Sequence, residues 1–401
     1  MTRTFADLGV PADLCSALAE RGIELPFPIQ AATLPDGLAG RDVSGRAPTG
    51  SGKTIAFGLA IIARLERRAR PKRPRALVLV PTRELADQVT RELQALGAPR
   101  QVSVVAVYGG TGYHIQRKLL RRGTDVLVAC PGRLEDLLQQ GDLALSDVEL
   151  VAVDEADRMA DMGFLPAVRR ILDQTAAERQ TLLFSATLDG DVDVLVKRYQ
   201  KDPVRHEIEI EQSDIGEIRH VFWAVERDAR VSVTADVVTR HQPAIVFTRT
   251  RHGADRLVKQ LAREGVAAVP IHGNRTQPQR TKALAAFTSG EASVLVATDV
   301  AARGIHVDDV ACVVHYDPPA DSKDYVHRSG RTGRAGADGM VYSLVEESSR
   351  SQVRTIMRDL GIDQRIEHPD GRVAEEAGAG PRRFGPSRGG RPSSDAGVPR
   401  S

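Results

Sequence analysis

The chain has no long apolar run and few cysteines, and both absences narrow what it can be. None of its hydrophobic stretches approaches the roughly 20 residues that cross a bilayer. Its first ten residues, MTRTFADLGV, lack the basic and then apolar layout of a secretory signal. The three cysteines, Cys15, Cys130 and Cys312, are far apart and include no Cys-x-x-Cys pair. This argues against a disulfide scaffold or a zinc site and predicts reduced thiols in a cytoplasmic protein.

Aromatic residues and net charge are also scarce. Phe, Trp and Tyr make up 4% of the 401 residues, and the formal net charge is +2. The charge is unevenly distributed, because residues 371–401 hold six Arg against two Glu and one Asp, a net of +3. The first 370 residues therefore sum to −1. Any contact with nucleic acid by this larger part must be local, whereas the tail attracts polyanions in general.

What is present is a globular composition, with 41% hydrophobic and 27% charged residues, in a chain long enough for two domains and an appendage. Short, uninterrupted apolar runs alternate with helical stretches, which is typical of parallel strands buried on both faces. We therefore expect two α/β doubly wound lobes. The expected strands are 41–47, 76–80, 102–108, 125–128, 150–153 and 181–184, then 218–225, 244–247, 267–270, 294–297, 310–315 and 339–344.

The same pass along the chain predicts five segments. A helical lead-in covers 1–36, the first lobe 37–204 and the second lobe 217–366. Residues 205–216 are charged, follow no helix or strand pattern, and predict a linker between the lobes. Residues 367–401 are rich in Gly, Pro, Arg and Ser and have little to bury, so they predict a disordered tail.

The stretch Ala47–Thr54, APTGSGKT, fits a phosphate-binding loop. Gly50 and Gly52 would allow backbone N–H groups to approach phosphate oxygens without a Cβ in the way. Lys53 would place its charge on the β- and γ-phosphates, and the Thr54 hydroxyl would hold Mg²⁺. A helix expected over 55–68, with one apolar face, would add its N-terminal dipole. The alternative is a chance Gly/Ser/Thr turn.

Two further segments supply the other groups that phosphoryl transfer needs. The apolar run 150–153 ends in Asp154 and Glu155, so Asp154 can hold Mg²⁺ and Glu155 can orient an attacking water. The run 324–336, DYVHRSGRTGRAG, spaces Arg328, Arg331 and Arg334 by three, with glycines between them. Planar cations presented across a cleft can neutralise charge on the transferring group. The alternatives are a polar turn and a solvated basic turn.

These motifs stand in the order that is found in DEAD-box ATP-dependent RNA helicases of superfamily 2, and the chain resembles that family over residues 5–336. The subtype it is most similar to is the compact bacterial RhlE type. The matching segments are Phe5 with Gln30, APTGSGKT, PTRELA (81–86), YGG (108–110), CPGR (130–133), DEAD (154–157), SAT (185–187), VFTRT (246–250), Gln277 with Arg280, TDVAARGIH (298–306) and HRSGRTGR (327–334).

The resemblance implies two tandem RecA-like lobes that hydrolyse ATP with Mg²⁺ and separate short RNA duplexes or remodel RNA–protein complexes. The ATP site would comprise Phe5, stacked on adenine, Gln30 at the adenine edge, and Ala47, Pro48, Thr49, Gly50, Ser51, Gly52, Lys53 and Thr54. Catalytic groups would be Lys53, Asp154, Glu155, His327, Arg331 and Arg334, with Thr54 and Asp154 on the metal. Ser185 and Thr187 would couple hydrolysis to RNA release.

The family pattern also implies an RNA site on both lobes. Its residues would be Thr82, Arg83, Gly109, Gly110 and Arg133 on the first lobe, and Thr248, Arg249, Gln277, Arg280 and Thr298 on the second. Contacts with the backbone carry no base information, so binding should be largely independent of sequence. The expected partners are single-stranded and short duplex RNA, with ribosomal precursors and the RNA-decay machinery as candidates. We expect no membrane association and a monomeric core.

Four positions depart from the family pattern. Pro48 stands where Gln is usual, Cys130 where Thr is usual, and Ser329 where an aliphatic residue is usual. His306 replaces an Asp that meets the ATP ribose, although Asp308 lies close by. Two rival hypotheses remain: a non-enzymatic RNA clamp, and a DNA translocase of the same superfamily. The intact set of charged groups argues against the first, and the adenine-reading motif argues against the second.

Overall fold

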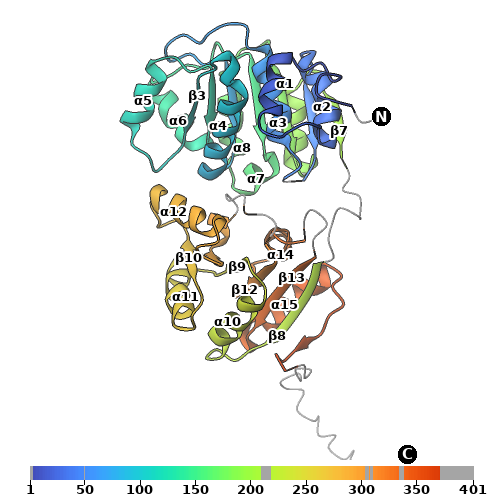
Figure 1. Ribbon diagram of the computed structural model, residues 1–401, viewed down its shortest axis with the longest axis vertical. Helices are drawn as coiled ribbons and strands as arrows, with labels where there is room; N and C mark the ends of the chain where they lie inside the picture. Colours follow the sequence, from blue (N-terminus) through green and yellow to red (C-terminus); the bar gives the residue numbers. More distant parts are fainter. Residues whose placement is uncertain are drawn as a thin grey trace, which may run out of the picture.

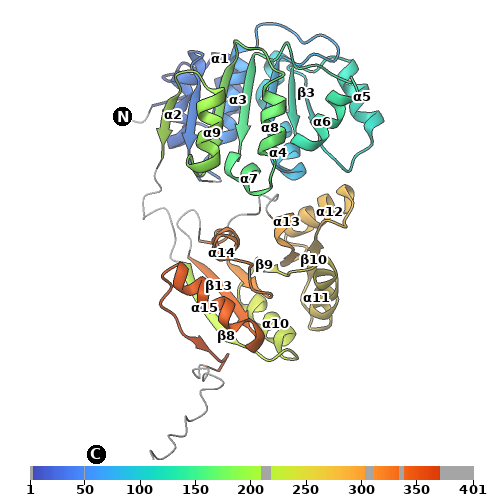
Figure 2. The same cartoon turned by 180° about the vertical axis from the view of Figure 1, so that it is seen from behind.

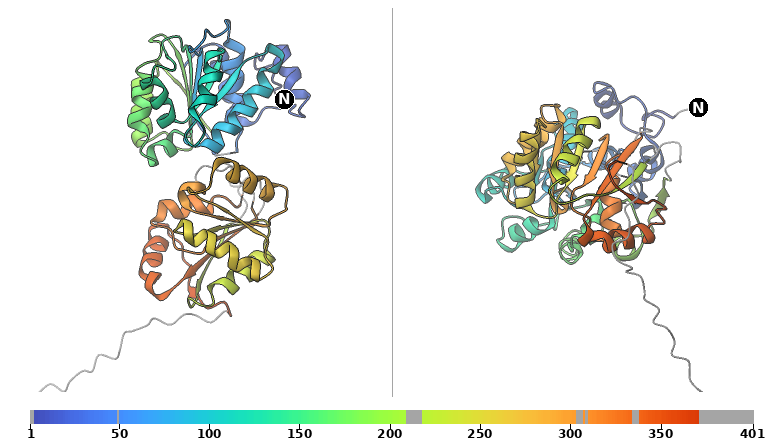
Figure 3. Two further views of the ribbon diagram at one scale, coloured as in Figure 1. Left: turned by 90° about the vertical axis from the view of Figure 1, so that its left-hand side faces the viewer. Right: turned by 90° about the horizontal axis from the view of Figure 1, so that it is seen from below.

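A computed structural model of the chain describes residues 3–48, 50–208, 218–302, 307, 310–333 and 338–370. These residues form two seven-stranded sheets, which lie one above the other along the long axis of the molecule (Figures 1 and 3). All strand pairs within the sheets are parallel. The prediction of two doubly wound lobes is confirmed. Residues 371–401 of the predicted tail and 209–216 of the predicted linker lie outside the described residues.

The first lobe begins with two helices and then alternates strands and helices. Its elements are α1 (Ala12–Ala19), α2 (Pro28–Leu38), β1 (Val43–Arg46), α3 (Lys53–Arg64), β2 (Ala76–Leu79), α4 (Arg83–Gly97), a 3₁₀ turn (Ala98–Arg100), β3 (Val104–Val107), α5 (Tyr113–Arg121), β4 (Val126–Ala129), α6 (Pro131–Gln139), β5 (Leu150–Asp154), α7 (Ala156–Asp161), α8 (Leu165–Leu172), β6 (Gln180–Ser185), α9 (Gly190–Tyr199) and β7 (Val204–Glu207). The strand order across the sheet is β3-β4-β2-β5-β6-β1-β7.

The second lobe repeats this plan. Its elements are β8 (Ile218–Ala224), α10 (Arg230–Arg240), β9 (Ala244–Phe247), α11 (Arg251–Arg263), β10 (Ala268–Ile271), α12 (Gln277–Thr288), β11 (Val294–Ala297), α13 (Asp299–Ala302), β12 (Cys312–His315), α14 (Ser322–Ser329), β13 (Gly339–Val345), a 3₁₀ turn (Glu347–Ser349), α15 (Arg350–Asp359) and β14 (Ile366–Glu367). The strand order is β10-β11-β9-β12-β13-β8-β14.

Strands β2, β4, β9 and β11 are apolar and buried at every position because helices cover both faces of each sheet. In β2, Ala76 and Val78 face the core formed with α3 and α4, while Leu77 and Leu79 face the core formed with α6 and α8. Figure 1 shows the first of these helix layers in front, and Figure 2 shows the second. A strand buried on both faces has no polar alternation, which is why the apolar runs located these strands in the sequence.

The helix after the phosphate-binding loop differs from its prediction in position and in burial. It begins at Lys53 and ends at Arg64 instead of covering 55–68, since Leu65 is extended and a basic, proline-containing stretch follows. Its burial is not confined to one face, because α2 and α4 flank it while its remaining face packs on the sheet. The predicted single apolar stripe was therefore too narrow.

Two edge strands were missed by the sequence analysis. β7 pairs with β1 and includes residues 205–207, which the sequence had placed in the linker. Its sequence, VRHE, alternates between half-buried and exposed positions, because an edge strand is covered only in part. β14 pairs with β8 through two residues. Neither has an apolar run, so neither gives the signal that located the buried strands.

The carboxyl ends of the strands in both sheets face the other lobe. After β5, Arg158 of α7 donates to the carbonyl of Ala302 at the end of α13. After β2, Glu84 of α4 forms an ion pair with Arg280 of α12. Loops at the carboxyl ends of parallel strands form ligand sites, so a ligand site is expected at the interface between the lobes. Among the described residues, no helix is both long and apolar enough to span a membrane.

Candidate ATP site and RNA-binding surface

The phosphate-binding loop connects β1 to α3 and is folded back on itself. Gly50 and Gly52 both have φ in the left-handed region, +87° and +84°, which an L side chain rarely adopts. The Lys53 ammonium donates to the carbonyl of Ala47 at 3.0 Å, and the residue is 6% exposed. Ser51 Oγ donates to Pro48 O at 2.8 Å. The Lys53 ammonium is therefore held by a backbone carbonyl in this structure. Thr49 lies outside the described residues.

Gln30 lies directly beside this loop. Its Nε2 donates to Gly52 O at 3.0 Å, and its Oε1 accepts from the backbone N–H of Phe27 at 2.9 Å. Its amide therefore uses, in this structure, the donor and acceptor that an adenine edge would take. Phe5 is 3% exposed and packs in the hydrophobic core of the first lobe. Its ring is covered in this structure, and the stacking role that the resemblance implies for it stays a prediction.

The acidic segment after β5 has an unusual backbone. Glu155 has φ +52°, a left-handed conformation that is uncommon for a residue with a side chain and is typical of functional sites. Asp154 Oδ1 accepts from the N–H of Glu155 at 3.0 Å. The Glu155 carboxylate forms an ion pair with Arg158 at 2.7 Å, and both side chains are largely buried. Arg158 was missed by the sequence analysis, although a spacing of three on a helix is a readable signal.

The segment after β6 is tied to the acidic segment. Ser185 Oγ accepts from the N–H of Asp157 at 3.1 Å, and Asp157 Oδ2 accepts from the N–H of Ala186 at 3.2 Å. Thr187 is exposed. The two ends of neighbouring strands β5 and β6 are thus held together by Ser185, while the side chain of Thr187 faces solvent.

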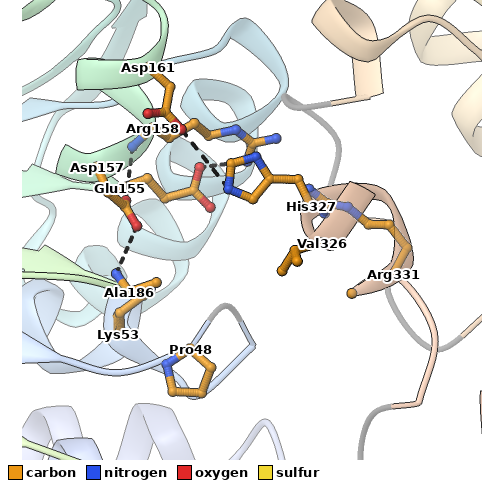
Figure 4. Close-up of a pocket in the computed structure, with 11 residues that line it drawn as sticks. Pro48, Lys53, Glu155, Asp157, Arg158, Asp161, Ala186, Val326, His327 and Arg331 are labelled. Carbon is orange, nitrogen blue, oxygen red and sulfur yellow. Dashed lines mark hydrogen bonds and ion pairs between the residues drawn. The ribbon is translucent and has the colours of Figure 1, made fainter. Parts of the chain in front are cut away.

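A cavity of about 220 Å³ opens between the two lobes at these residues. The first lobe lines it with the phosphate-binding loop and α7, and the second lobe lines it with α14 (Figure 4). His327 points toward Asp161 across the interface, with 4.0 Å between Nε2 and Oδ2, and Lys323 forms an ion pair with the same carboxylate. The cavity therefore gathers groups predicted for catalysis from both lobes, namely Lys53, Glu155, His327 and Arg331.

The three arginines of the 324–336 run have different surroundings. Arg331 lines the cavity. Arg328 is turned back into the second lobe, where it forms a bidentate pair with Asp299 at 2.6 and 2.8 Å and lies 5.0 Å from the centre of the Phe247 ring. Arg328 therefore holds α14 on the second lobe instead of facing the cleft. Arg334 lies outside the described residues.

The residues predicted to contact RNA on the first lobe lie after β2, β3 and β4. Thr82 caps α4 by accepting from the N–H of Leu85. A Cβ at Gly110 would lie 2.9 Å from Cζ of Arg83, so the glycine pair, Gly109 and Gly110, allows this guanidinium to lie against the backbone. Arg133 is 9% exposed; it donates to Thr111 O at 3.0 Å and stacks over the Tyr113 ring. In this structure its guanidinium is bound to the backbone just after the glycine pair and is not presented to solvent.

On the second lobe the corresponding residues lie after β9, β10 and β11. Arg249 is exposed, whereas Thr248 is 1% and Thr298 is 7% exposed. Gln277 and Arg280 are both 7% exposed and lie on α12. Arg280 Nε donates to Glu84 Oε1 at 2.6 Å across the interface, and Gln277 is 3.5 Å from the same oxygen. The structure thus brings α12 to α4, next to Thr82 and Arg83.

The departures from the family pattern have local consequences. Burial raises the pKa of the Cys130 thiol, so the thiol stays neutral and does not repel a phosphate. The hydroxyl of Ser329 is buried, and its oxygen has no hydrogen-bond partner in the described part of the chain. Pro48 lines the cavity between the lobes. His306 and Asp308 lie outside the described residues.

Within the described ranges, no cluster of three or more His, Cys, Asp or Glu side chains could hold a metal by itself. The oxygens of Thr54 and Asp154 are ligands of the kind that Mg²⁺ prefers, and Mg²⁺ in nucleotide sites takes only one or two protein ligands besides phosphate and water. The donor set therefore fits Mg²⁺ only in company with a nucleotide.

Comparison with known proteins gives two matching family models. The model of the DEAD/DEAH box helicases matches residues 27–195, and the model of the helicase conserved C-terminal domain matches residues 229–336. The first model spans most of the first lobe, and the second spans the second lobe from α10 to the arginine-rich run 324–336.

The chain is also similar to individual proteins over most of its length. The DEAD-box ATP-dependent RNA helicase CshA of Bacillus subtilis is 38% identical over 360 residues, which span 89% of this chain and 72% of that protein. The ATP-dependent RNA helicase RhlB of Shewanella frigidimarina is 40% identical over 355 residues, with coverages of 86% and 82%. The structure of S. cerevisiae Dbp5 bound to RNA and ADP BeF3 aligns with a TM-score of 0.73 and 26% identity, covering 90% of this chain and 94% of that one.

Proposed function

Because this chain belongs to the DEAD-box ATP-dependent RNA helicases, it is an RNA-dependent ATPase and helicase, and we propose how its residues divide the work. The single observation that carries the proposal is the cavity between the lobes, where Lys53 and Glu155 of one lobe lie with His327 and Arg331 of the other. A site completed only when two lobes meet can couple hydrolysis to the lobes' closure.

On the nucleotide side, Gly50, Gly52 and Lys53 bind the phosphates and Glu155 orients the attacking water. Mg²⁺, held by Thr54 and Asp154, would neutralise charge that develops on the phosphates. Arg331 and Arg334 stabilise the transferring group from the second lobe, and His327 holds the water network. Ser185 accepts a hydrogen bond from the N–H of Asp157, and through this bond a movement of the acidic segment 154–157 would reach the end of β6.

On the RNA side, α4 and the glycine pair of the first lobe and α12 of the second hold the backbone of a single strand. In support of this, Arg83 lies over the glycine pair, and Arg280 reaches α4. ATP and RNA together close the lobes, the closed form excludes the second strand of a short duplex, and phosphate release reopens the lobes. The chain is proposed to comprise segments 1–36, 37–204 extended by the edge strand β7, 217–366 and the tail, and to act in the cytoplasm.

Two substitutions at one site test this division of roles. Lys53→Ala removes the ammonium that neutralises the bound phosphates, so it should abolish ATP binding, and with it hydrolysis and closure of the lobes. Glu155→Gln keeps the shape and a hydrogen-bonding oxygen but removes the carboxylate, so ATP should bind without being hydrolysed. The lobes should then stay closed on RNA, and the RNA dissociation rate in ATP should fall by roughly tenfold or more, a ~1.4 kcal/mol effect.

The measurement is RNA dissociation with ATP present, beside the hydrolysis rate with RNA and with DNA as activators. Unchanged hydrolysis in Glu155→Gln, or RNA release as fast as from the unmutated protein, would show that Glu155 has another role. Equal stimulation by DNA would favour the translocase hypothesis, and RNA binding without any hydrolysis by the unmutated protein would favour the clamp.

A further inference from the structure

Phe27 is an aromatic side chain that the fold leaves exposed. Five large hydrophobic side chains in the described part of the chain are markedly exposed, and Phe27, at 56%, is the only aromatic one among them. The other four are aliphatic: Leu25, Ile115, Val194 and Val326. A single exposed apolar residue is common and needs no explanation by itself. Whether the exposure of Phe27 has a function depends on the groups around its ring.

The ring of Phe27 lies against the phosphate-binding loop. A Cβ built on Gly52 would lie 2.8 Å from Cδ2 of Phe27, so the ring edge contacts the backbone of Gly52. The N–H of Phe27 donates to Oε1 of Gln30, and Nε2 of Gln30 donates to Gly52 O. Phe27, Gln30 and Gly52 therefore form one contiguous group at the edge of the loop.

The backbone holds Phe27 in a fixed position. It is the residue before α2, with φ −66° and ψ 159°, and it stands between Pro26 and Pro28. A residue that precedes proline is restricted to extended conformations, and Pro28 occupies the first position of the helix, where it is well tolerated. The ring is thus presented beside the loop by a stiff segment, so little conformational entropy is lost if a ligand packs on it.

A purine nucleotide needs two kinds of contact beyond its phosphates: hydrogen bonds at the base edge and a flat apolar face. Gln30 offers the first, whereas Phe5, to which the resemblance gives the second, is 3% exposed in this structure and presents no face to a ligand there. We propose that Phe27 is the residue on which the base of the bound nucleotide stacks. This rests on the proposed binding of ATP at Gln30 and the loop, and it assigns the face of the base to a residue that the sequence analysis did not single out.

The test separates the base from the phosphates by comparing ADP with inorganic tripolyphosphate. Phe27→Ala should weaken ADP binding by roughly 5- to 100-fold, the usual effect of removing an aromatic platform, and leave tripolyphosphate binding unchanged. Phe27→Tyr should retain the ADP affinity. Leu25→Ala is the matched control, since Leu25 is 53% exposed in the same segment, and it should change neither affinity.

Face and edge contacts are told apart with GDP. Stacking tolerates every base, so Phe27→Ala should weaken ADP and GDP by similar factors, whereas Gln30→Ala should reduce the preference for ADP over GDP. An unchanged ADP affinity in Phe27→Ala overturns the proposal. So does an equal loss of ADP and tripolyphosphate, because it would mean that Phe27 only supports the loop. If the unmutated protein bound neither ligand, the proposed function itself would be wrong.

Discussion

His315 at the end of β12 is a fully buried histidine that packs against α14, the helix that carries His327. Its Nδ1 lies 3.1 Å from Ser343 Oγ, and its ring packs edge-on against Tyr325 of α14. Burial, with the nearby charges of Arg328 and His220, lowers the pKa of His315 well below its ordinary value. The imidazole is therefore neutral in the folded protein, and protonation would place an unpaired charge in the core.

We expect this residue to make the protein less stable in mild acid. Below the ordinary pKa of 6.5 the unfolded chain binds a proton at His315 that the folded chain refuses. Stability is therefore fully present above that pH and lost as the pH falls, by at most about 1.4 kcal/mol per pH unit for one histidine. The measurement is denaturant unfolding of the full chain from about pH 7.5 to about pH 5, where this dependence is expected.

His315→Gln should flatten this pH dependence, and His114→Gln, which changes an exposed histidine, should not. Burial also lowers the pKa of His220, whose Nδ1 lies 2.8 Å from Tyr325 Oη, so a residual slope should remain in His315→Gln. A slope identical to that of the unmutated protein would mean that folding does not change the pKa of His315.

At the scale of elements, the strand order places two functions on two halves of each sheet. The residues proposed to contact RNA follow β3, β4 and β2 in the first lobe and β10, β11 and β9 in the second, and these strands are neighbours. The residues proposed to contact phosphate, metal and water on the first lobe follow β1 and β5, Ser185 ends β6, and α14 follows β12. Because α4 meets α12, the halves of the two sheets proposed to bind RNA face each other. Because α7 meets α14, the halves proposed to form the nucleotide site also face each other.

The ion pair between α4 and α12 should link RNA binding to the approach of the lobes. Glu84 and Arg280 are each 9% exposed at the side chain and their atoms are 2.6 Å apart, so either charge alone would be left poorly solvated. We expect Glu84→Gln and Arg280→Gln each to weaken RNA affinity in the presence of ATP, by roughly 1–3 kcal/mol of shared coupling energy. Affinity for ATP without RNA should not change.

A double-mutant cycle on the RNA concentration that gives half-maximal ATPase activity measures this coupling. Glu92→Gln on the same helix is the control, since Glu92 pairs with Arg21 inside the first lobe. Additive effects of the two interface substitutions would mean that the pair contributes nothing to RNA binding.

The same elements show what the sequence could and could not predict. β9 and β11 have the bounds expected from their apolar runs. A strand buried on both faces is apolar along its whole length, so the run marks both of its ends. β7 and β14 were missed because edge strands need no such run. Gln30 lies beside the phosphate-binding loop and Lys53 at its end, as local motifs would place them, and their roles stay predictions. The exposure of Phe27 and the burial of Phe5 and Arg133 were not predictable, because they depend on packing between segments distant in sequence.

At the scale of the whole molecule, charge is concentrated in residues 371–401, which lie outside the described part of the chain and carry a net charge of +3 from six Arg. We expect deletion of 371–401 to weaken RNA binding and leave ATP turnover at saturating RNA nearly unchanged. The logarithmic dependence of affinity on salt should become shallower by about 0.7 for each lost phosphate contact on a single strand. A salt dependence that the deletion leaves unaltered would show that the tail makes no contact with RNA.

The two lobes are connected through strands that belong to their sheets: β7 pairs with β1, and β8 lies between β13 and β14. Ten residue steps separate Ile208 from Ile218, and a chain of that length spans at most about 35 Å whatever its path. Each lobe is therefore present to the other at an effective concentration on the order of millimolar. Reclosure is a unimolecular event that dilution cannot slow, and a cut within residues 209–217 would turn it into an encounter between two molecules.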